Sequence, residues 1–168
     1  MKNVRKDNKG FSLVELIVVV LIMAIIAVAL APQVLRWVDN ARKANDLQLM
    51  GTIMTACDVA LTNEEANAWA KAYTVKVTCT TSNSGLSVSK EAVSGKTYSG
   101  SYDETKFKTL VAKSLPSGTD SKTKVAGSTI EIVISNGVTQ ERASDDATAA
   151  GKSTYKVDGT VVSDKTLE

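Results

Sequence analysis

Glu15 is an acidic side chain inside a stretch of sequence that is otherwise apolar. The stretch runs from Phe11 to Ala31, and Ser12 is the other polar residue within it. An acidic side chain at the centre of a membrane span costs about 2.5–3.5 kcal/mol on insertion scales, and less toward the end of the span. A residue kept at such a cost is a candidate for function, so Glu15 must be matched with a partner.

The remainder of the sequence offers little catalytic chemistry. It contains no histidine, the commonest general base and metal ligand. Asp145 and Asp146 are adjacent, but neither a spaced third ligand nor a glycine turn accompanies them, so we interpret them as surface charges. The acidic pairs at 64–65 and 103–104 fall in the first turns of predicted helices, where they suit the helix dipole. We therefore predict a protein that is not an enzyme, with no catalytic residues, no metal site and no cofactor.

The apolar stretch has the length and the flanking charge of a membrane span. About 20 helical residues cover roughly 30 Å, the thickness of the hydrocarbon core of a bilayer. Residues 1–10 carry four basic side chains and one acidic one, a net charge of +3, whereas the rest of the chain has 16 basic and 17 acidic groups. Because positive flanks stay in the cytoplasm, we expect the basic segment inside and the rest of the chain outside. The nearly neutral remainder gives no reason to expect a nucleic-acid surface.

Two common interpretations of such a segment meet difficulties here. A secretory signal peptide would be cut best after Ala29-Leu30-Ala31, but Pro32 follows and is a poor residue at a scissile bond. A plain membrane anchor leaves Glu15 without a purpose.

A third interpretation accounts for both Pro32 and Glu15. The stretch Lys9-Gly10-Phe11-Ser12-Leu13-Val14-Glu15-Leu16 closely resembles the class-III signal of type IV prepilins. The resemblance implies that a membrane prepilin peptidase cuts between Gly10 and Phe11 on the cytoplasmic side and that the new amine of Phe11 is N-methylated. Glu15 would then be the fifth residue of the mature chain.

The resemblance also supplies a partner for Glu15. The amine of Phe11 would be a cation in an apolar layer, and a buried charge is far less costly when it is paired. Glu15 could neutralise the Phe11 amine of a neighbouring subunit and so set the register of a filament. It could equally pair with Phe11 of its own chain, one helical turn away. The sequence leaves both alternatives open.

Pro32 ends the apolar run and lacks the N–H that would bond to the carbonyl of Val28, so we expect a kink or a local opening of the helix. A proline here is common in the pilin family. Ala24 stands where many relatives have glycine, a departure that bears on whether the helix melts between these two points in a filament.

The helical pattern continues beyond Pro32 with polar residues added. Apolar residues recur every three or four positions at Val34, Trp37, Val38, Ala41, Ala44, Leu47, Met50, Ile53, Met54, Cys57 and Leu61. Polar residues occupy intervening positions at Arg36, Asp39, Arg42, Lys43, Asp46 and Asp58. This pattern predicts an amphipathic helix whose apolar stripe lies on a sheet.

Shorter elements follow. Thr62-Asn63-Glu64-Glu65 reads as a capping box that opens a helix to about Tyr73, and 101–104 reads as a second one before a helix that Pro116-Ser117-Gly118 ends. Alternation at 75–79 and 130–134 predicts two half-buried strands, and 86–88 a short one. Asn136-Gly137 predicts a turn toward Val138, and Asp158-Gly159 joins strands at 153–157 and 160–164 into a hairpin.

These elements predict an α+β fold that matches the pilin fold: a long N-terminal helix packed on a small antiparallel sheet, with its apolar half protruding. We divide the chain into a cleaved leader at 1–10, an apolar membrane and polymerisation segment at 11–35, and an extracytoplasmic domain at 36–168. The resemblance itself covers about the first 35 residues.

Cys57 and Cys79 depart from the arrangement familiar in Gram-negative pilins, in which a disulfide closes a C-terminal loop. Both are predicted to face inward, one from the helix and one from the first strand. A disulfide between them would stabilise an exported domain by roughly 3 kcal/mol in the chain-entropy model. The alternative is two buried thiols that act as small apolar residues. We favour the disulfide because exported compartments are oxidising in many bacteria.

The leading hypothesis is a structural one, a major pilin that polymerises into a type IV pilus serving adhesion, twitching motility, aggregation or DNA uptake. Its expected partners are the prepilin peptidase, identical or related subunits, an inner-membrane assembly platform, an assembly ATPase and, before assembly, membrane lipid. A pseudopilin of a type II secretion or competence system shares the signal. A membrane-anchored binding domain is the alternative from another class and predicts an uncut Gly10–Phe11 bond.

Three lysines lie on one predicted helix, Lys106, Lys108 and Lys113. We interpret them as a solvated helix face that could instead contact DNA or another anionic surface.

Overall fold

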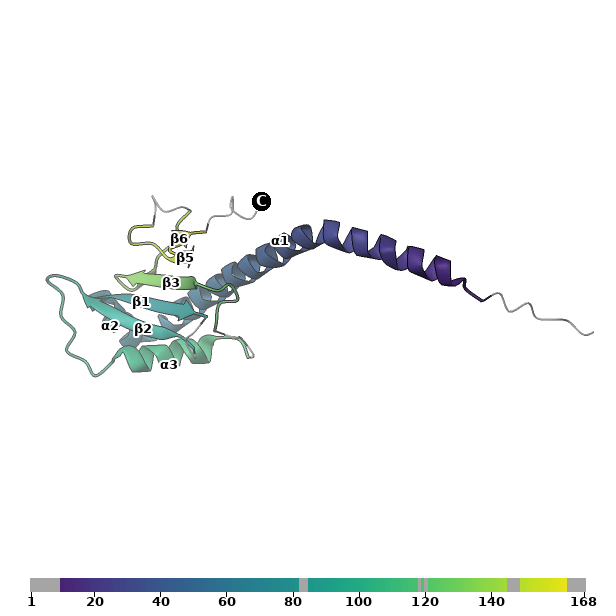
Figure 1. The fold of residues 1–168 in the computed structure, drawn as a ribbon. Helices are drawn as coiled ribbons and strands as arrows, with labels where there is room; N and C mark the ends of the chain where they lie inside the picture. Colours follow the sequence, from purple (N-terminus) through teal and green to yellow (C-terminus); the bar gives the residue numbers. More distant parts are fainter. Residues whose placement is uncertain (1–9, 82–84, 118, 120, 145–148, 163–168) are drawn as a thin grey trace, which may run out of the picture. The chain divides into compact units, whose positions relative to one another are not determined.

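The computed structural model describes residues 10–81, 85–117, 119, 121–144 and 149–162 (Figure 1). The chain forms two compact units, Met1–Val38 and Asp39–Glu168. In chain order the elements are α1 (Leu13–Ala60), α2 (Glu64–Ala72), β1 (Tyr73–Thr80), β2 (Ser87–Ala92), α3 (Glu104–Ser114), β3 (Ser128–Ser135), β4 (Val138–Thr139), β5 (Thr154–Val157) and β6 (Thr160–Val161). This is the predicted α+β fold, with a long N-terminal helix and a small antiparallel sheet.

Helix α1 contributes to both units. In the first unit, every described side chain from residue 10 to 38 is exposed, although most of them are aliphatic. Pro32 lies within the helix, which is continuous through it. Proline still leaves one helical hydrogen bond unmade at this point, because it has no N–H.

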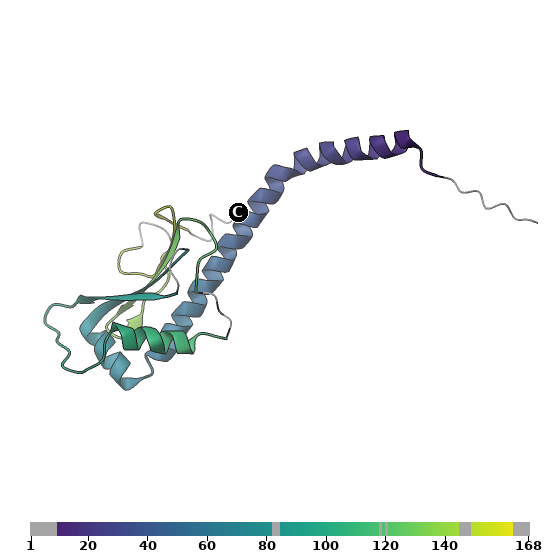
Figure 2. The same cartoon turned by 60° about the horizontal axis from the view of Figure 1, so that its bottom comes forward.

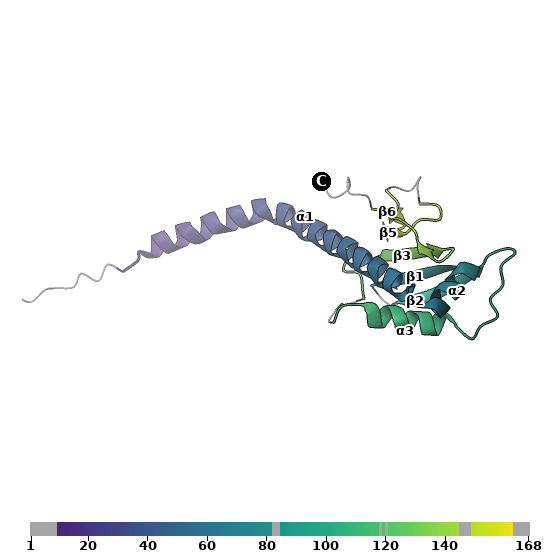
Figure 3. The same ribbon diagram turned by 180° about the vertical axis from the view of Figure 1, so that it is seen from behind.

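In the second unit, α1 covers one face of the sheet. It lies behind the strands in Figure 1 and in front of them in Figure 3. Its buried residues recur at helical spacing: Asp46, Met50, Ile53, Ala56, Cys57 and Ala60. The predicted apolar stripe is therefore present, but Asp46, which we placed among the polar positions, is fully buried.

All strand pairs of the sheet are antiparallel, and the strand order is β2-β1-β3-β5-β6 with β4 paired to β3. Val75, Val77 and Cys79 of β1 point into the core, as the alternation predicted. On β3, Ile130 and Ile132 do the same. The period of two therefore identified the buried face of both central strands correctly.

Strand β2, at one edge of the sheet, was predicted poorly. We expected a strand at 86–88, whereas β2 spans Ser87–Ala92 and pairs along its length with β1. Its residues are exposed except Val88, which is half-buried opposite Val77. An edge strand held by backbone bonds needs no apolar alternation, so its sequence carries little signal.

Two turns lie where the sequence predicted them. Asn136 and Gly137 both have positive φ, at 55° and 75°, and connect β3 to β4. Asp158 and Gly159 do so at 48° and 86° between β5 and β6. Positive φ at both central residues suits the twist of a two-residue hairpin. The predicted end of the second hairpin at 163–164 lies outside the described residues, as do Gly118, Asp145 and Asp146.

Both predicted helix caps are displaced along the chain. The N-cap of α2 is Asn63, not Thr62, and its side chain accepts from the Ala66 amide at 3.1 Å. The N-cap of α3 is Asp103, not Ser101, and it accepts from the Lys106 amide at 2.9 Å. Asn and Asp compete well with Ser and Thr for this position, so the motif alone chose the wrong residue.

The core of the second unit is centred on Trp69 of α2. Its ring centroid lies 5.4 Å from that of Phe107 and 5.8 Å from that of Tyr102. These contacts bring α2 and α3 together, and α3 lies alongside β2 (Figure 2). Lys90 of β2 pairs with Glu104 of α3 at 3.2 Å.

Candidate functional site: the N-terminal segment

The predicted cleavage point lies just before the first helix. Gly10 and Phe11 precede α1, and the side chain of Phe11 is 91% exposed. A side chain added at Gly10 would meet nothing within 4 Å. The bond between the two residues is therefore free of packing by the described part of the chain.

Glu15 caps the helix that it belongs to. Its carboxylate accepts a hydrogen bond of 2.9 Å from the backbone amide of Ser12. Ser12 directly precedes α1, which places Glu15 at the third helical position, where a glutamate reaches back to the N-cap amide. Sequence reasoning missed this role, although Ser12-Leu13-Val14-Glu15 has the S-x-x-E spacing of a capping box.

The surface around Glu15 is apolar. A hollow of about 260 Å³ is lined by Phe11, Glu15, Leu16, Val19 and Val20. A carboxylate beside such a surface is exposed to water in the isolated chain. It would lose that water if an apolar neighbour covered the hollow, and it would then need a cation or a donor.

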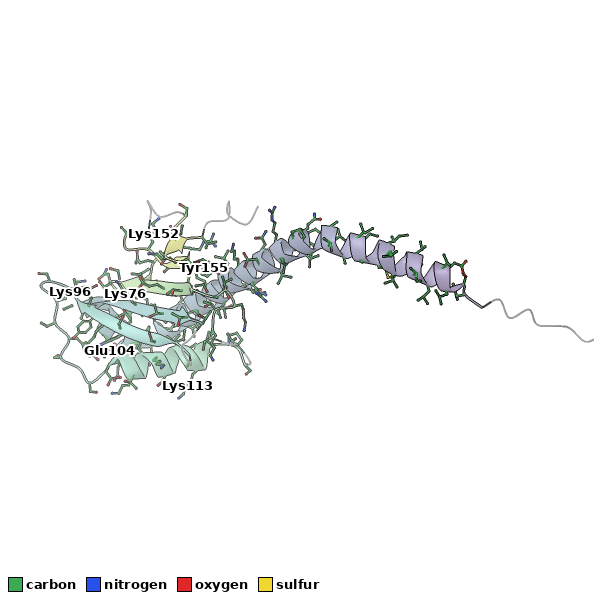
Figure 4. The ribbon with its side chains drawn as sticks, viewed as in Figure 1. Lys76, Lys96, Glu104, Lys113, Lys152 and Tyr155 are labelled. Atoms are coloured by element: carbon green, nitrogen blue, oxygen red, sulfur yellow. The ribbon has the colours of Figure 1, made fainter. Side chains whose placement is uncertain are left out.

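The first half of α1 has the length and composition of a membrane span. Among the described helices, α1 is the one long and apolar enough to cross a bilayer. None of its apolar stretch is buried within the chain. Large exposed apolar surfaces mark contacts with a membrane or another protein. Figure 4 shows these side chains projecting all round the helix.

The two cysteines lie in the second unit and are both buried. The structure contains them as thiols, and the thiol of Cys79 donates to the carbonyl of Ser121. Burial, and then the charge of Asp58, raise the pKa of the Cys57 thiol to about 12. Such a thiol is poorly reactive at neutral pH. The disulfide between Cys57 and Cys79 stays a prediction.

Asp46 is the polar residue whose position sequence reasoning misjudged. Its carboxylate accepts from the backbone amides of Lys124 and Val125, at 2.6 and 3.1 Å, and from the hydroxyl of Tyr155 at 3.0 Å. The hydroxyl of Ser128 donates to it at 3.4 Å. Several donors converge on this carboxylate, which satisfies a buried charge and fixes the loop before β3 to α1. Figure 4 labels Tyr155 on β5.

Comparison with protein families matches residues 5–31 to the prokaryotic N-terminal methylation motif. This motif is the class-III signal of type IV pilins and pseudopilins, and it is the substrate signal of the prepilin peptidase. It covers residues 5–10 of the basic segment, the predicted cleavage point, Glu15 and the apolar run to Ala31. Neither a curated protein nor a solved structure matches the chain.

The motif and the fold together define the class of the protein. A class-III signal leads into an apolar helix, and the helix continues onto a small antiparallel sheet. The chain is a type IV pilin-like or pseudopilin-like protein. The matched motif is the signal of structural, pilin-type proteins. It is consistent with a protein that is not an enzyme and that is anchored in a membrane.

Proposed function

We propose that the chain is the major subunit of a type IV pilus. The peptidase removes residues 1–10 and exposes the amine of Phe11, which is N-methylated. Residues 11–35 hold the subunit in the membrane and later form the filament core, and 36–168 form the domain outside the cell. An assembly platform and an ATPase at the inner membrane drive its extraction, and the fibre serves adhesion, motility, aggregation or DNA uptake.

The exposed apolar surface of α1 is the observation that carries this proposal. Aliphatic side chains from Leu13 to Val38 remain exposed in the single chain. At about 25 cal/mol for each Å² of apolar surface, leaving this surface in water is unfavourable. Lipid covers it before assembly, and the helices of other subunits cover it in a filament.

Glu15 supports a role in assembly because its bond to Ser12 leaves part of the carboxylate available. An ionised carboxylate has two oxygens and accepts several hydrogen bonds. The bond from the Ser12 amide takes up only one of these hydrogen bonds. The remaining capacity can meet the Phe11 amine of a neighbour in the hollow beside Glu15. Capping and pairing are then compatible roles of one side chain.

The test compares two substitutions at Glu15 in cells that make surface filaments. Glu15→Gln keeps an acceptor for the Ser12 amide but removes the charge, whereas Glu15→Ala removes both. We expect both variants to be processed to a chain that starts at N-methyl-Phe11 and both to lose filaments. Intact mass and N-terminal sequence report the processing, and electron microscopy of sheared filaments reports the assembly.

The other outcomes assign other functions. Normal filaments from Glu15→Gln would limit Glu15 to capping and exclude the charge-pair mechanism. A processed subunit that forms only short periplasmic fibres, and whose loss blocks protein secretion or transformation, would indicate a pseudopilin. A chain left whole at Gly10–Phe11, with no filament in the wild type, would indicate a membrane-anchored binding domain.

A further inference from the structure

Trp37 of α1 is exposed, although its spacing placed it in the stripe that was predicted to lie on a sheet. Its side chain is 62% exposed, whereas Trp69, the second tryptophan of the chain, is fully buried. The side chains of Val34, Leu35 and Val38 around it are exposed as well. A large aromatic ring among exposed apolar neighbours marks a surface that contacts a membrane or another protein.

Arg36, next to Trp37, is the first charged residue after Glu15. Arg36 and Glu15 lie 21 positions apart on one continuous helix, which corresponds to about 32 Å along its axis. This length matches the hydrocarbon core of a bilayer, which is about 30 Å thick. A chain that spans a membrane through the uncharged stretch 16–35 therefore has Glu15 at one surface of the hydrocarbon core and Arg36 at the other.

The side chains at the Arg36 end of this stretch lean back toward the apolar run. In an α-helix the Cα–Cβ bonds tilt toward the N-terminus, and a long side chain covers the turn before its own Cα. The apolar run of α1 lies on that side of Arg36 and Trp37. Both residues suit the layer just outside the hydrocarbon core, because each has an apolar body and a polar or charged end.

The charge of Arg36 calls for an anion from outside the chain. Among the described residues, Arg36 forms no ion pair with a carboxylate. Its guanidinium presents five N–H donors in a planar fork that matches the oxygens of a phosphate. The exposed Gln33 lies three positions before Arg36 and four before Trp37, so the three side chains share one face of the helix. This face combines a cation, an amide and an aromatic ring.

We propose, on the basis of the membrane-held stage of the proposed function, that Arg36 and Trp37 bind the headgroup of an anionic phospholipid and so fix the depth of α1 in the membrane. The guanidinium bonds to the lipid phosphate, and the amide of Gln33 donates to the same headgroup. The indole ring lies between the headgroups and the first carbons of the acyl chains.

A fixed depth has a consequence at the other end of the helix. With Arg36 at one surface of the hydrocarbon core, Glu15 lies at the opposite surface, one core thickness away. The Gly10–Phe11 bond precedes Glu15 and then lies in the headgroup layer or in water. The lipid contacts of Arg36 and Trp37 therefore present the predicted cleavage point outside the hydrocarbon core.

A second copy of the chain fits this surface less well. Two copies side by side at the same depth bring one Arg36 close to the other, and like charges repel. No carboxylate lies between residues 16 and 38 to offset them. The next one along the chain, Asp39, is already paired with Lys43 at 3.0 Å. Lipid phosphates supply the negative charge that a second copy lacks here.

The first experiment measures the depth of Trp37 with the full chain in phosphatidylcholine vesicles that contain dibrominated lipids. Trp69 is fully buried and out of reach of bromines on the lipid chains, so fluorescence quenching reports Trp37. We expect quenching to be strongest with bromines nearest the headgroup and weakest with bromines near the chain ends. Trp37→Phe should remove the quenching and gives the background from Trp69.

The second experiment tests the charge of Arg36. A small fraction of brominated phosphatidylglycerol replaces brominated phosphatidylcholine, and the quenching of Trp37 reports how much of each lipid gathers at the ring. We expect the unmodified chain to select the anionic lipid about fivefold, the preference that one arginine gives near an anionic surface. Arg36→Gln should reduce this selection to that of random mixing. Lys108→Gln, which removes a charge from an exposed position of α3, should leave it unchanged.

The basic segment at 1–10 is the same in all these proteins, so the difference between them isolates Arg36. Equal selection by the unmodified chain and Arg36→Gln would overturn the proposal. Strongest quenching by the deepest bromines would also overturn it, because the ring would lie inside the hydrocarbon. A ring that no bromine quenches, in a chain that crosslinks as a dimer, would assign the surface to a second copy instead.

Vesicle flotation after an alkaline wash separates this proposal from the proposed function on which it rests. A chain that leaves the vesicles would refute the membrane-held stage of the pilin function itself, and with it the lipid contacts. A chain that stays in the vesicles but fails the quenching tests would refute only the roles of Arg36 and Trp37.

Discussion

The hydroxyl of Tyr155 donates a 3.0 Å hydrogen bond to the carboxylate of Asp46, which lies 109 positions earlier in the chain. Both side chains are fully buried. The bond therefore joins α1 to β5, two elements far apart in the chain. Burial, and then the bond and charge of Asp46, raise the pKa of Tyr155 well above its usual range. The phenol therefore remains a donor at physiological pH.

Removing Asp46 should destabilise the second unit far more than removing the Tyr155 hydroxyl. Asp46→Ala leaves buried amides and hydroxyls without an acceptor, and we expect a loss of about 3 kcal/mol in the free energy of unfolding. Tyr155→Phe removes one donor and should cost about 1 kcal/mol. Denaturant unfolding of the full chain in detergent measures both. Equal effects would mean that the amides of Lys124 and Val125 gain nothing from Asp46.

The cap of α2 can be assigned by a pair of neighbouring substitutions. Asn63→Ala removes the acceptor of the Ala66 amide and should cost about 1 kcal/mol. Thr62→Ala removes a hydroxyl that donates to the exposed carbonyl of Val59, and it should change stability by less than about 0.5 kcal/mol. Thermal unfolding followed by circular dichroism compares them. The reverse order of the two losses would restore Thr62 as the cap.

Ionisation of Cys57 should make the reduced protein less stable in alkali. Its pKa rises from 9.0 to about 12 on folding, so the unfolded chain loses the thiol proton first. The stability contributed by the protonated thiol is therefore complete below pH 9 and is lost between pH 9 and about 12. The loss should approach about 1.4 kcal/mol per pH unit.

Cys57→Ala is the control for this pH dependence. Its free energy of unfolding should start from a lower value, because a buried side chain is shortened, but should fall less steeply above pH 9. Unfolding midpoints at a series of pH values, with a reductant present, give the two slopes. Parallel slopes would show that Cys57 ionises equally in both states.

Two hairpin glycines should differ in their tolerance of alanine. Gly137 and Gly159 have φ of 75° and 86°, so alanine costs about 1–2 kcal/mol at either from backbone strain. A side chain at Gly137 would also come within 2.9 Å of Cγ of Lys71, whereas one at Gly159 meets nothing within 4 Å. We expect Gly137→Ala to cost about 1 kcal/mol more, because Lys71 must leave its rotamer. Chemical denaturation of the two variants measures the difference, and equal losses would show that Lys71 moves aside freely.

The local features of this chain could be predicted from its sequence because they depend on neighbouring residues. The spacing of Gly10, Phe11 and Glu15 identified the N-terminal signal, which the family match at 5–31 confirms. Hydrophobic period identified the stripe of α1 and the inward faces of β1 and β3. Backbone geometry fixes these periods at 3.6 and 2 residues, whatever the rest of the chain does.

Contacts between distant segments lay beyond such reasoning. Asp46 looks like any polar residue of an amphipathic helix, and its burial depends on amides and a hydroxyl that lie 78 to 109 positions away. The extent of β2 is set by its backbone bonds to β1.

The sequence by itself determined that this chain carries a class-III signal followed by an apolar helix, since a run of side-chain types is sufficient to define both. The tertiary structure decided which polar groups are buried together and that β2 forms one edge of the sheet. Those outcomes depend on which segments meet in space, and their energies arise from desolvation and hydrogen bonding between residues far apart in the chain.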